Sequence, residues 1–289
     1  WSRLIRFAAQ DGRIYHGQPV VDQLGRFPQA LGGLEAYVVE GDIFGANSVT
    51  NTLLKVEKLL APLERVPIFL GIGLNYASHA AELKTAPPPQ PVLFTKPPGA
   101  LQHPFEPIVV PRVCADAEAD YEAELAVVIG KRCKNVNAHE ALHYVAGYTC
   151  ANDVTARYWQ RQVGQWTFSK SFDTFCPLGP VITSTALIPD PNALGISLRL
   201  NGELMQNSST KDMIYPVASL VSFLSQGTTL EPGTVILTGT PPGVGTGKDP
   251  KLVLKHDDRC EVEIESIGTL VNPVVYGADE PSVEWRTLP

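Results

Sequence analysis

The segment that most constrains the fold is the run of residues 125–129, Leu-Ala-Val-Val-Ile, which Gly130 closes. A short, continuous, largely β-branched apolar run predicts a strand that is buried on both faces. Glu122 and Glu124 stand at its start, and residues two apart on a strand share a face. Two carboxylates entering a core together repel each other and lose hydration, and a cation between them keeps both ionised. We therefore predict a buried strand with a metal site at its beginning.

A Glu-x-Glu pair at a strand entrance is also typical of a solvated sheet edge. Asp153 favours the metal site, because it follows residues 144–149, which we predict to form a neighbouring strand. Hard oxygen ligands favour Mg²⁺, Mn²⁺ or Ca²⁺ over zinc. Three carboxylates would leave roughly half of an octahedral Mg²⁺ shell for water and substrate, as in an open, catalytic site.

The bulk composition excludes several classes of protein. The 289 residues are 44% hydrophobic and 18% charged, which is typical of a globular chain of one or two domains. The net charge of −7 argues against a nucleic-acid or anionic-membrane partner. No apolar run approaches the ~18 residues of a membrane-spanning helix. The five cysteines include no Cys-x-x-Cys pair, so we expect reduced thiols in an intracellular protein of the cytoplasm or mitochondrial matrix. Whether a targeting segment precedes Trp1 stays open.

Two domains are expected. In residues 1–62, strand-like stretches over 4–8 and 13–16 flank an Asp11-Gly12 turn, and apolar residues spaced for one helix face predict a helix over 51–60. These residues are Leu53, Leu54, Val56, Leu59 and Leu60. We interpret this unit as a small α+β accessory domain.

Residues 63–289 form the expected catalytic domain. Short β-rich runs with many Gly and Pro residues predict an α+β, sheet-dominated fold, with helices over 138–145, 154–161 and 217–225. No regular strand–helix alternation indicates a parallel α/β fold.

His79 and Glu82 are three residues apart, so on a helical turn the carboxylate can hydrogen-bond the imidazole. Such a dyad is a candidate general base. An exposed pair on a surface helix is the alternative.

Lys170 lies in the aromatic, β-prone stretch 165–173. It could titrate low enough to transfer protons, clamp a substrate carboxylate, or extend to the surface. Arg157 and Gln160 follow Asp153 by four and seven residues, one helical face away from the metal, and either could grip a carboxylate. The Gly-rich stretch 238–248 has neither P-loop nor dinucleotide-binding spacing, and we interpret it as a backbone-lined loop at a site.

Together these segments resemble the fumarylacetoacetate hydrolase superfamily over residues 66–275. The resemblance rests on seven ordered motifs: Gly73-x-Asn75-Tyr76-x-x-His79-x-x-Glu82, Phe94-x-Lys96-Pro97, Glu122-x-Glu124-Leu125, Asp153-x-Thr155-Ala156-Arg157-x-x-Gln160, Lys170-Ser171-Phe172-Asp173, Asn201-Gly202-Glu203 and Gly239-Thr240-Pro241-Pro242-Gly243-Val244-Gly245. Within the superfamily, the stretch 170–180 and the presence of an N-terminal domain resemble the branch called fumarylacetoacetate hydrolase domain-containing 2. That branch is assigned as oxaloacetate tautomerase.

The resemblance implies a homodimeric β-roll core that binds Mg²⁺ or Mn²⁺ through Glu122, Glu124 and Asp153. It places His79 and Glu82 on a flexible lid helix. Lys170 would face the substrate, and Arg157, Gln160 and Thr240 would surround it. The chain departs from the family at Tyr158-Trp159, where a bulkier pocket wall is expected.

These features predict Mg²⁺-dependent keto–enol tautomerisation of oxaloacetate, with a small 2-oxo acid as the only partner besides a second copy of the chain. A related hydrolase that cleaves a C–C bond of an acylpyruvate, or a decarboxylase of oxaloacetate or another β-keto acid, is the alternative. A third reading is a binding or scaffold protein that retains the fold, against which the intact set of carboxylates, lysine and dyad argues.

Overall fold

The computed structural model describes residues 1–22, 27, 32–114 and 118–277, and in this part of the chain strands dominate. The strands are β1 (Arg3–Ala9), β2 (Ile14–Pro19), β3 (Glu35–Gly41), β4 (Asn47–Leu60), β5 (Phe69–Gly73), β6 (Val92–Lys96), β7 (Leu101–Gln102), β8 (Ile108–Val110), β9 (Ala119–Asp120), β10 (Ala123–Ile129), β11 (Val145–Asn152), β12 (Thr155–Ala156), β13 (Cys176–Ser184), β14 (Gly195–Leu200), β15 (Glu203–Ser209), β16 (Val235–Leu237), β17 (Arg259–Ile264) and β18 (Gly268–Tyr276). The α-helices are α1 (Ala77–Glu82), α2 (Arg157–Gln162), α3 (Thr167–Lys170) and α4 (Val217–Leu224). The 3₁₀ turns are η1 (Pro98–Ala100), η2 (Arg112–Cys114), η3 (Ala141–Tyr144), η4 (Thr210–Asp212) and η5 (Gly245–Gly247).

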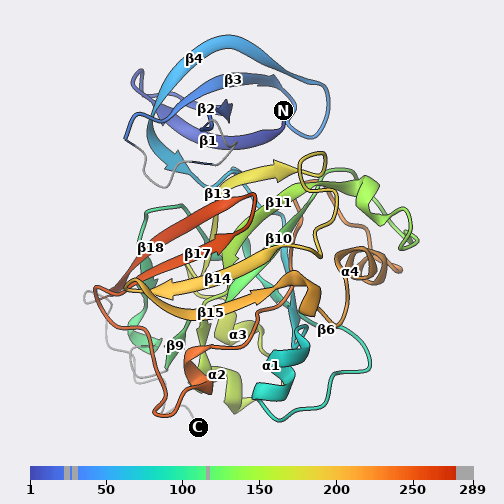
Figure 1. The fold of residues 1–289 in the computed structure, drawn as a ribbon, viewed down its shortest axis with the longest axis vertical. Coiled ribbons are helices and arrows are strands. Elements are labelled where there is room, and N and C mark those ends of the chain that lie inside the picture. Colours follow the sequence, from blue (N-terminus) through green and yellow to red (C-terminus); the bar gives the residue numbers. More distant parts are fainter. Residues whose placement is uncertain (23–26, 28–31, 115–117, 278–289) are drawn as a thin grey trace.

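The strands form one long sheet, a second large sheet and a short pair. The long sheet has the order β2-β3-β4-β1-β13-β11-β10-β16-β5-β6, and β7 pairs with β13. The second sheet has the order β15-β14-β17-β18-β8, and β12 pairs with β9. Figure 1 shows the second sheet lying across β10 and β11. The sheet-dominated α+β prediction is confirmed.

Strand β10 lies in the middle of the catalytic part and is buried on both faces. Leu125, Val127 and Ile129 enter one apolar cluster, and Ala126 and Val128 enter the other. Antiparallel partners flank it, β11 on one side and β16 on the other. The apolar run therefore forms the predicted buried strand, and it fixes the place where Glu122 and Glu124 enter the core.

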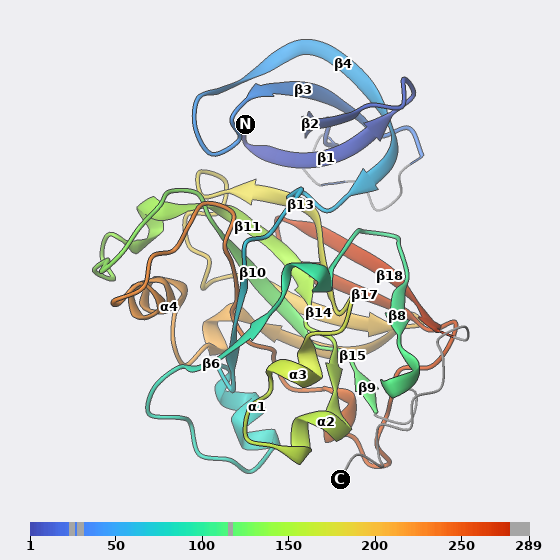
Figure 2. The same ribbon diagram turned by 180° about the vertical axis from the view of Figure 1, so that it is seen from behind.

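Strands β1 to β4 form the sheet at one end of the molecule (Figures 1 and 2). The predicted strands around the Asp11-Gly12 turn are present as β1 and β2, and Gly12 adopts a left-handed φ of 76°. This sheet joins the rest of the protein through β1, where Leu4 pairs with Ile182 of β13. We propose residue 62, between β4 and β5, as the boundary of the N-terminal unit.

The helix predicted over residues 51–60 is wrong, because this segment belongs to the 14-residue strand β4. Its apolar residues fit a helix face equally well, but β4 hydrogen-bonds to β3 and β1 along its length. The burial follows the strand: Leu59 is 1% exposed, whereas Leu53 is 41% exposed. Pairing with two neighbouring strands outweighs the weak helical preference of the segment. No helix occurs in the described residues of the N-terminal unit.

The three other predicted helices fare differently. The prediction over 217–225 is confirmed by α4. The prediction over 138–145 is wrong except for the short turn η3, because the chain enters strand β11 at Val145. The prediction over 154–161 is half right, since β12 precedes α2. Among the described residues, no helix has the length and apolar character that crossing a membrane requires.

Candidate active site

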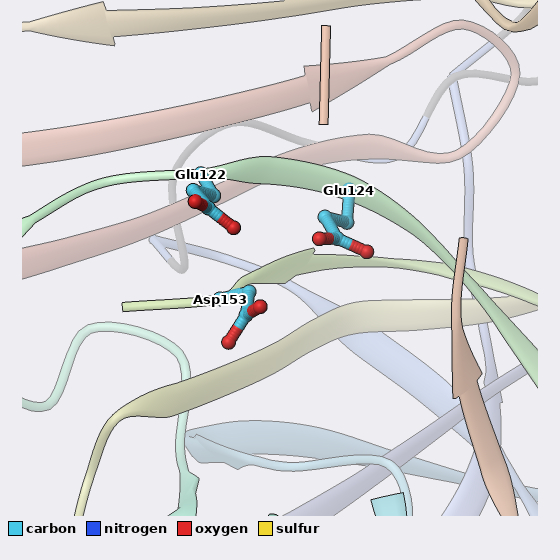
Figure 3. Close-up of side chains that lie close together, drawn as sticks. All are labelled: Glu122, Glu124 and Asp153. Carbon is cyan, nitrogen blue, oxygen red and sulfur yellow. The ribbon is translucent and has the colours of Figure 1, made fainter. Parts of the chain in front are cut away.

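The three predicted metal ligands meet where β10 begins and β11 ends. Glu124 lies opposite Ala151 in the antiparallel pair, and the amide of Asp153 donates to the carbonyl of Glu122 at 2.9 Å. Figure 3 shows both glutamates projecting from one side of their strand toward Asp153. One carboxylate oxygen from each lies within 4.8 Å of the others, and all three residues are buried. The pairing of β10 with β11 thus assembles the cluster.

Two buried lysines neutralise part of this cluster. Lys170 Nζ donates to Glu122 Oε2 at 2.9 Å, to Asp153 Oδ2 at 2.5 Å and to Thr155 Oγ1 at 2.8 Å. Lys96 Nζ donates to Asp153 Oδ1 and to the carbonyl of Val154. Asp153 therefore faces a cation on each of its carboxylate oxygens.

Charge balance differs between the two glutamates. Burial would raise the pKa of Glu122, but Lys170 and Arg157 outweigh burial and lower this pKa to about 2. Burial and the negative charges of Asp153 and Glu122 hold the pKa of Glu124 well above its ordinary value. Within the described residues, Glu124 forms no salt bridge and accepts one backbone hydrogen bond, from Gly239 at 2.7 Å. An unneutralised carboxylate beside two others is a donor set that fits a divalent cation.

The sequence around Lys170 suggested a β-strand, but Lys170 lies at the end of helix α3. It is 1% exposed, so it does not extend to the surface, and its Nζ lies 4.5 Å from the centre of the Phe94 ring. Burial would lower the pKa of Lys170, but Asp153 and Glu122 raise it. Of the alternatives that the sequence left open for Lys170, this arrangement does not favour a lowered pKa, because two carboxylates contact its ammonium group.

The predicted dyad is formed on α1. His79 Nδ1 lies 2.9 Å from Glu82 Oε2, and Glu82 Oε1 accepts a hydrogen bond from the amide of Gly243 at 2.9 Å. A carboxylate only accepts, so Nδ1 carries the proton and Nε2 of His79 is left as an acceptor. His79 is buried, which distinguishes this dyad from an exposed surface pair.

Arg157 reaches the carboxylate cluster directly. Its Nη1 lies 2.6 Å from Glu122 Oε1 and donates to Gln160 Oε1 at 3.0 Å. The expectation that both residues lie one helical face away from the metal is wrong, because Asp153 is outside α2 and the helix begins at Arg157. Thr240, the third predicted substrate-binding residue, accepts from Gln206 Nε2 at 2.8 Å through its Oγ1.

Most of these side chains line a pocket of about 340 Å³. Helices α1, α2 and α3, which carry several of them, gather at one end of the sheets (Figure 2). Seven of the nine predicted site residues line the pocket: His79, Glu122, Glu124, Arg157, Gln160, Lys170 and Thr240. The other two, Glu82 and Asp153, contact His79 and Lys170. An apolar wall completes the pocket, formed by Ile72, Leu74, Leu83, Phe94, Trp166 and Val244. A charged floor under an apolar wall is the usual composition of a site for a small polar ligand.

The bulky wall expected at Tyr158-Trp159 is not part of this pocket. Trp159 donates through its indole to the carbonyl of Val113 at 3.1 Å and packs edge-on against Phe168. Both residues lie on α2, but its pocket-lining residues are Arg157, Gln160 and Arg161. The departure from the family pattern at these positions therefore lies outside the pocket lining.

Sequence reasoning assigned no role to Lys96 or Asp120, which are both 1% exposed. Lys96 shares a strand face with Phe94, and Asp120 lies two residues before Glu122. The period of two that identified Glu122 and Glu124 could have extended to Asp120. Lys96 belongs to the motif Phe94-x-Lys96-Pro97, but this motif does not show its role, since its partner Asp153 is 57 residues away.

Comparisons with known proteins bear on the same region. The family model described as "Fumarylacetoacetate (FAA) hydrolase C-terminal" matches residues 69–275. The oxaloacetate tautomerase Fahd2a, mitochondrial, of Rattus norvegicus is 44% identical over 217 residues, which are 75% of this chain and 69% of the relative. The fumarylacetoacetate hydrolase domain-containing protein 2 homolog of Dictyostelium discoideum is 46% identical over 241 residues, 79% of this chain and 78% of the relative.

A solved structure extends the likeness to the N-terminal unit. The 2-hydroxyhepta-2,4-diene-1,7-dioate isomerase from Mycobacterium marinum superposes with a TM-score of 0.82 at 35% sequence identity. The match covers 96% of this chain and 100% of the isomerase. The overall fold, including the N-terminal unit, therefore recurs in that structure.

Proposed function

Because this chain belongs to the fumarylacetoacetate hydrolase family, we propose that it is an enzyme that interconverts the keto and enol forms of oxaloacetate with the help of Mg²⁺. The Rattus norvegicus relative, which is named oxaloacetate tautomerase, supports this activity. The observation that carries the proposal is that one pocket is lined by Glu122, Glu124, Lys170 and His79, with Asp153 buried directly behind them and bonded to Lys170.

The metal would be held by Glu122, Glu124 and Asp153, whose charge and oxygen donors suit Mg²⁺, and also Mn²⁺ or Ca²⁺. When bound, the ion polarises the keto oxygen of a 2-oxo acid and stabilises negative charge that develops on it. Arg157, Gln160 and Thr240 line the same pocket and would orient the substrate, Arg157 by pairing with a carboxylate.

The residues of the chain then account for the proton transfer. His79 Nε2, left as an acceptor by the Nδ1–Glu82 hydrogen bond, takes a proton from C3 of the keto acid. Lys170, whose pKa is raised by Asp153 and Glu122, carries a proton that it donates to the oxygen at C2. The C3–H bond breaks, an O–H bond forms, and exchange of protons with water restores His79 and Lys170. The reverse sequence converts enol to keto.

The test follows oxaloacetate with Mg²⁺ by two signals at once, the ultraviolet absorbance of the enol and the formation of pyruvate. Rapid decay of the enol without pyruvate is the expected result. Lys170→Ala and Glu82→Ala should each slow the decay, because acid–base groups of this kind contribute ~10²–10⁴-fold. Full tautomerase activity in both variants would refute the assignment.

A second candidate is favoured by the same dyad. A His–Glu pair at 2.9 Å can activate water, which hydrolysis of a C–C bond needs and tautomerisation does not. Pyruvate released as fast as oxaloacetate disappears would indicate a decarboxylase, and pyruvate released from an acylpyruvate would indicate a hydrolase. A protein that neither reacts with these acids nor gains thermal stability from Mg²⁺ with oxalate would instead be a binding protein.

We further propose that the protein acts as a homodimer in the cytoplasm or the mitochondrial matrix. The names of the vertebrate relatives, which include the word mitochondrial, favour the matrix. Sedimentation of the purified protein tests the dimer, and fractionation of the source cells tests the compartment.

A further inference from the structure

A fourth buried carboxylate, Asp120, lies beside the triad without belonging to it. Asp120 ends β9, two residues before Glu122, and is 1% exposed. It does not line the pocket, and it is absent from the group of carboxylates that could share an ion. Its side chain therefore serves something other than contact with metal or ligand.

Both oxygens of Asp120 are fully engaged. Oδ1 accepts from the amides of Tyr121 at 2.9 Å and Gly245 at 2.8 Å. Oδ2 accepts from the amide of Thr246 at 3.0 Å and from Arg157 Nε at 2.8 Å. One carboxylate thus joins the strand that leads into the metal ligands, the loop 239–247 and the guanidinium group of Arg157.

The bond to Arg157 completes the orientation of a pocket residue. Asp120 holds Nε, while Glu122 and Gln160 hold Nη1. A guanidinium is planar and rigid, so fixing two of its nitrogens fixes the third. Within the described residues, Nη2 is buried and has no hydrogen-bond partner. A buried donor without a partner is costly, and a ligand carboxylate in the pocket would satisfy it.

The bonds to the loop fix a second part of the pocket. Thr240, Val244 and Thr246 line the pocket wall, and the two amides held by Asp120 belong to residues 245 and 246. The approach is close: a Cβ at Gly245 would lie 2.1 Å from the carbonyl oxygen of Leu252 and 2.7 Å from Asp120 Oδ1. The loop can reach Asp120 only because residue 245 is glycine.

We infer that Asp120 is a positioning residue for substrate binding, which sets the direction of Arg157 and anchors the wall formed by residues 240–246. The inference rests on the proposed function, in that Arg157 receives a carboxylate of the 2-oxo acid. Since Asp120 acts through Arg157, its loss should weaken substrate binding more than it slows proton transfer.

The test is Asp120→Asn. Asparagine keeps one oxygen for Tyr121 and Gly245, but its NH₂ group meets Arg157 Nε and the amide of Thr246, which are donors as well. The KM for oxaloacetate should rise by about tenfold or more while kcat stays within about twofold. Binding of oxalate to the Mg²⁺-loaded protein, measured by calorimetry, should weaken by a similar factor. This second readout decides the question even if oxaloacetate proves not to be the substrate.

A double-mutant cycle separates positioning from a structural role. In an Arg157→Ala background, Asp120→Asn should change oxalate affinity and KM by clearly less than in the parent, because only the contact of Asp120 with the loop is left to act. An undiminished effect in that background would overturn the inference. So would unchanged KM and oxalate affinity in the single variant.

Two further variants serve as a matched control and as a replacement if the first variant does not fold. Asp258→Asn is the matched control, since Asp258 also accepts from a backbone amide (Lys255) and a side chain (Asn201) but lies away from the pocket. It should leave KM unchanged, and a rise equal to that of Asp120→Asn would overturn the inference. If Asp120→Asn does not fold, Asp120→Ser, which is smaller and brings no NH₂ group, replaces it with the same expected rise in KM.

Discussion

The two ends of the molecule bury different kinds of side chain. In the described residues of the N-terminal unit, Arg6 is the only charged side chain that is buried. Around the pocket, seven acidic or basic side chains other than histidine are buried: Lys96, Asp120, Glu122, Glu124, Asp153, Arg157 and Lys170. Figure 1 shows these regions at opposite ends, with β1 to β4 at the top and α1 to α3 at the bottom.

Removing charges from water is expensive, and even a well-paired buried ion pair seldom adds stability. A fold that needed only stability would contain apolar side chains in their place. The concentration of charge at one end therefore indicates a site that is maintained for chemistry. The sheet β1 to β4 contributes apolar packing, so changes there should affect folding and leave the reaction intact.

The largest effect is expected for Glu124→Gln, which removes one of the proposed metal ligands while keeping the shape of the side chain. We expect kcat/KM to fall by about a thousandfold or more, since a bound ion supplies several kcal/mol of charge stabilisation. The rise in melting temperature on adding Mg²⁺ should also disappear. Glu57→Gln, on the exposed side of β4, is the control and should alter neither property. Mg²⁺-dependent stabilisation that survived in Glu124→Gln would contradict the metal site.

Leu59→Ala should destabilise the N-terminal unit, at the opposite end from the pocket. Leu59 is buried in the apolar core, so we expect a loss of about 2–5 kcal/mol of unfolding free energy with kcat preserved while the protein stays folded. Leu53→Ala makes the same chemical change in the same strand at an exposed position, and its cost should stay within about 0.5 kcal/mol. Urea unfolding measures both. Equal losses would mean that the strand arrangement of β4 is wrong.

Glu82→Gln should produce a smaller loss of activity. The glutamine keeps an oxygen for Gly243, but its NH₂ group faces His79 Nδ1 and forces the proton onto Nε2. We expect kcat to fall about tenfold to hundredfold with KM nearly unchanged, a part of the usual acid–base contribution. Ser78→Ala is the control, because it removes the hydroxyl hydrogen bond from α1 to Asp212 without touching the dyad, while the amide of residue 78 still donates to Asp212. A fall in the control as large as in Glu82→Gln would assign the effect to the helix.

The smallest expected effect is on the pH dependence of the unfolding free energy, through His103 at the junction between the two ends. His103 Nδ1 accepts from the amide of Ala61, and burial with the charges of Arg6 and Lys58 lowers the pKa of His103 below its ordinary 6.5. As pH falls, the imidazole of His103 is therefore protonated in the unfolded chain before it is protonated in the folded protein. The contribution of neutral His103 to the unfolding free energy is complete above pH 6.5 and is lost as pH falls through the lowered pKa. Unfolding free energy measured from pH 7.5 to 5 should decline less in His103→Gln than in the parent. His139→Gln, at an exposed histidine, should leave the slope unchanged. A steeper decline in His103→Gln would contradict this account.

Local patterns predicted those parts of the site that lie within a few residues of one another. The shared face of Glu122 and Glu124 follows from the period of two on a strand, and the His79–Glu82 contact follows from helical spacing. The same kind of reasoning failed over residues 51–60, where the apolar residues suit a helix face and a strand almost equally. The decision there came from the hydrogen bonds to β3 and β1, which lie outside the segment itself.

The sequence by itself determined the buried strand β10, the acidic triad and the family of the chain, because each is written in short motifs with a local physical meaning. Only the tertiary structure decided that Lys170 lies between two carboxylates that raise its pKa, that Lys96 neutralises Asp153, and that Asp120 binds both Arg157 and the loop 239–247. These contacts join residues far apart in the chain. Their strength depends on burial away from water, a property that no single segment possesses before the sheets have packed.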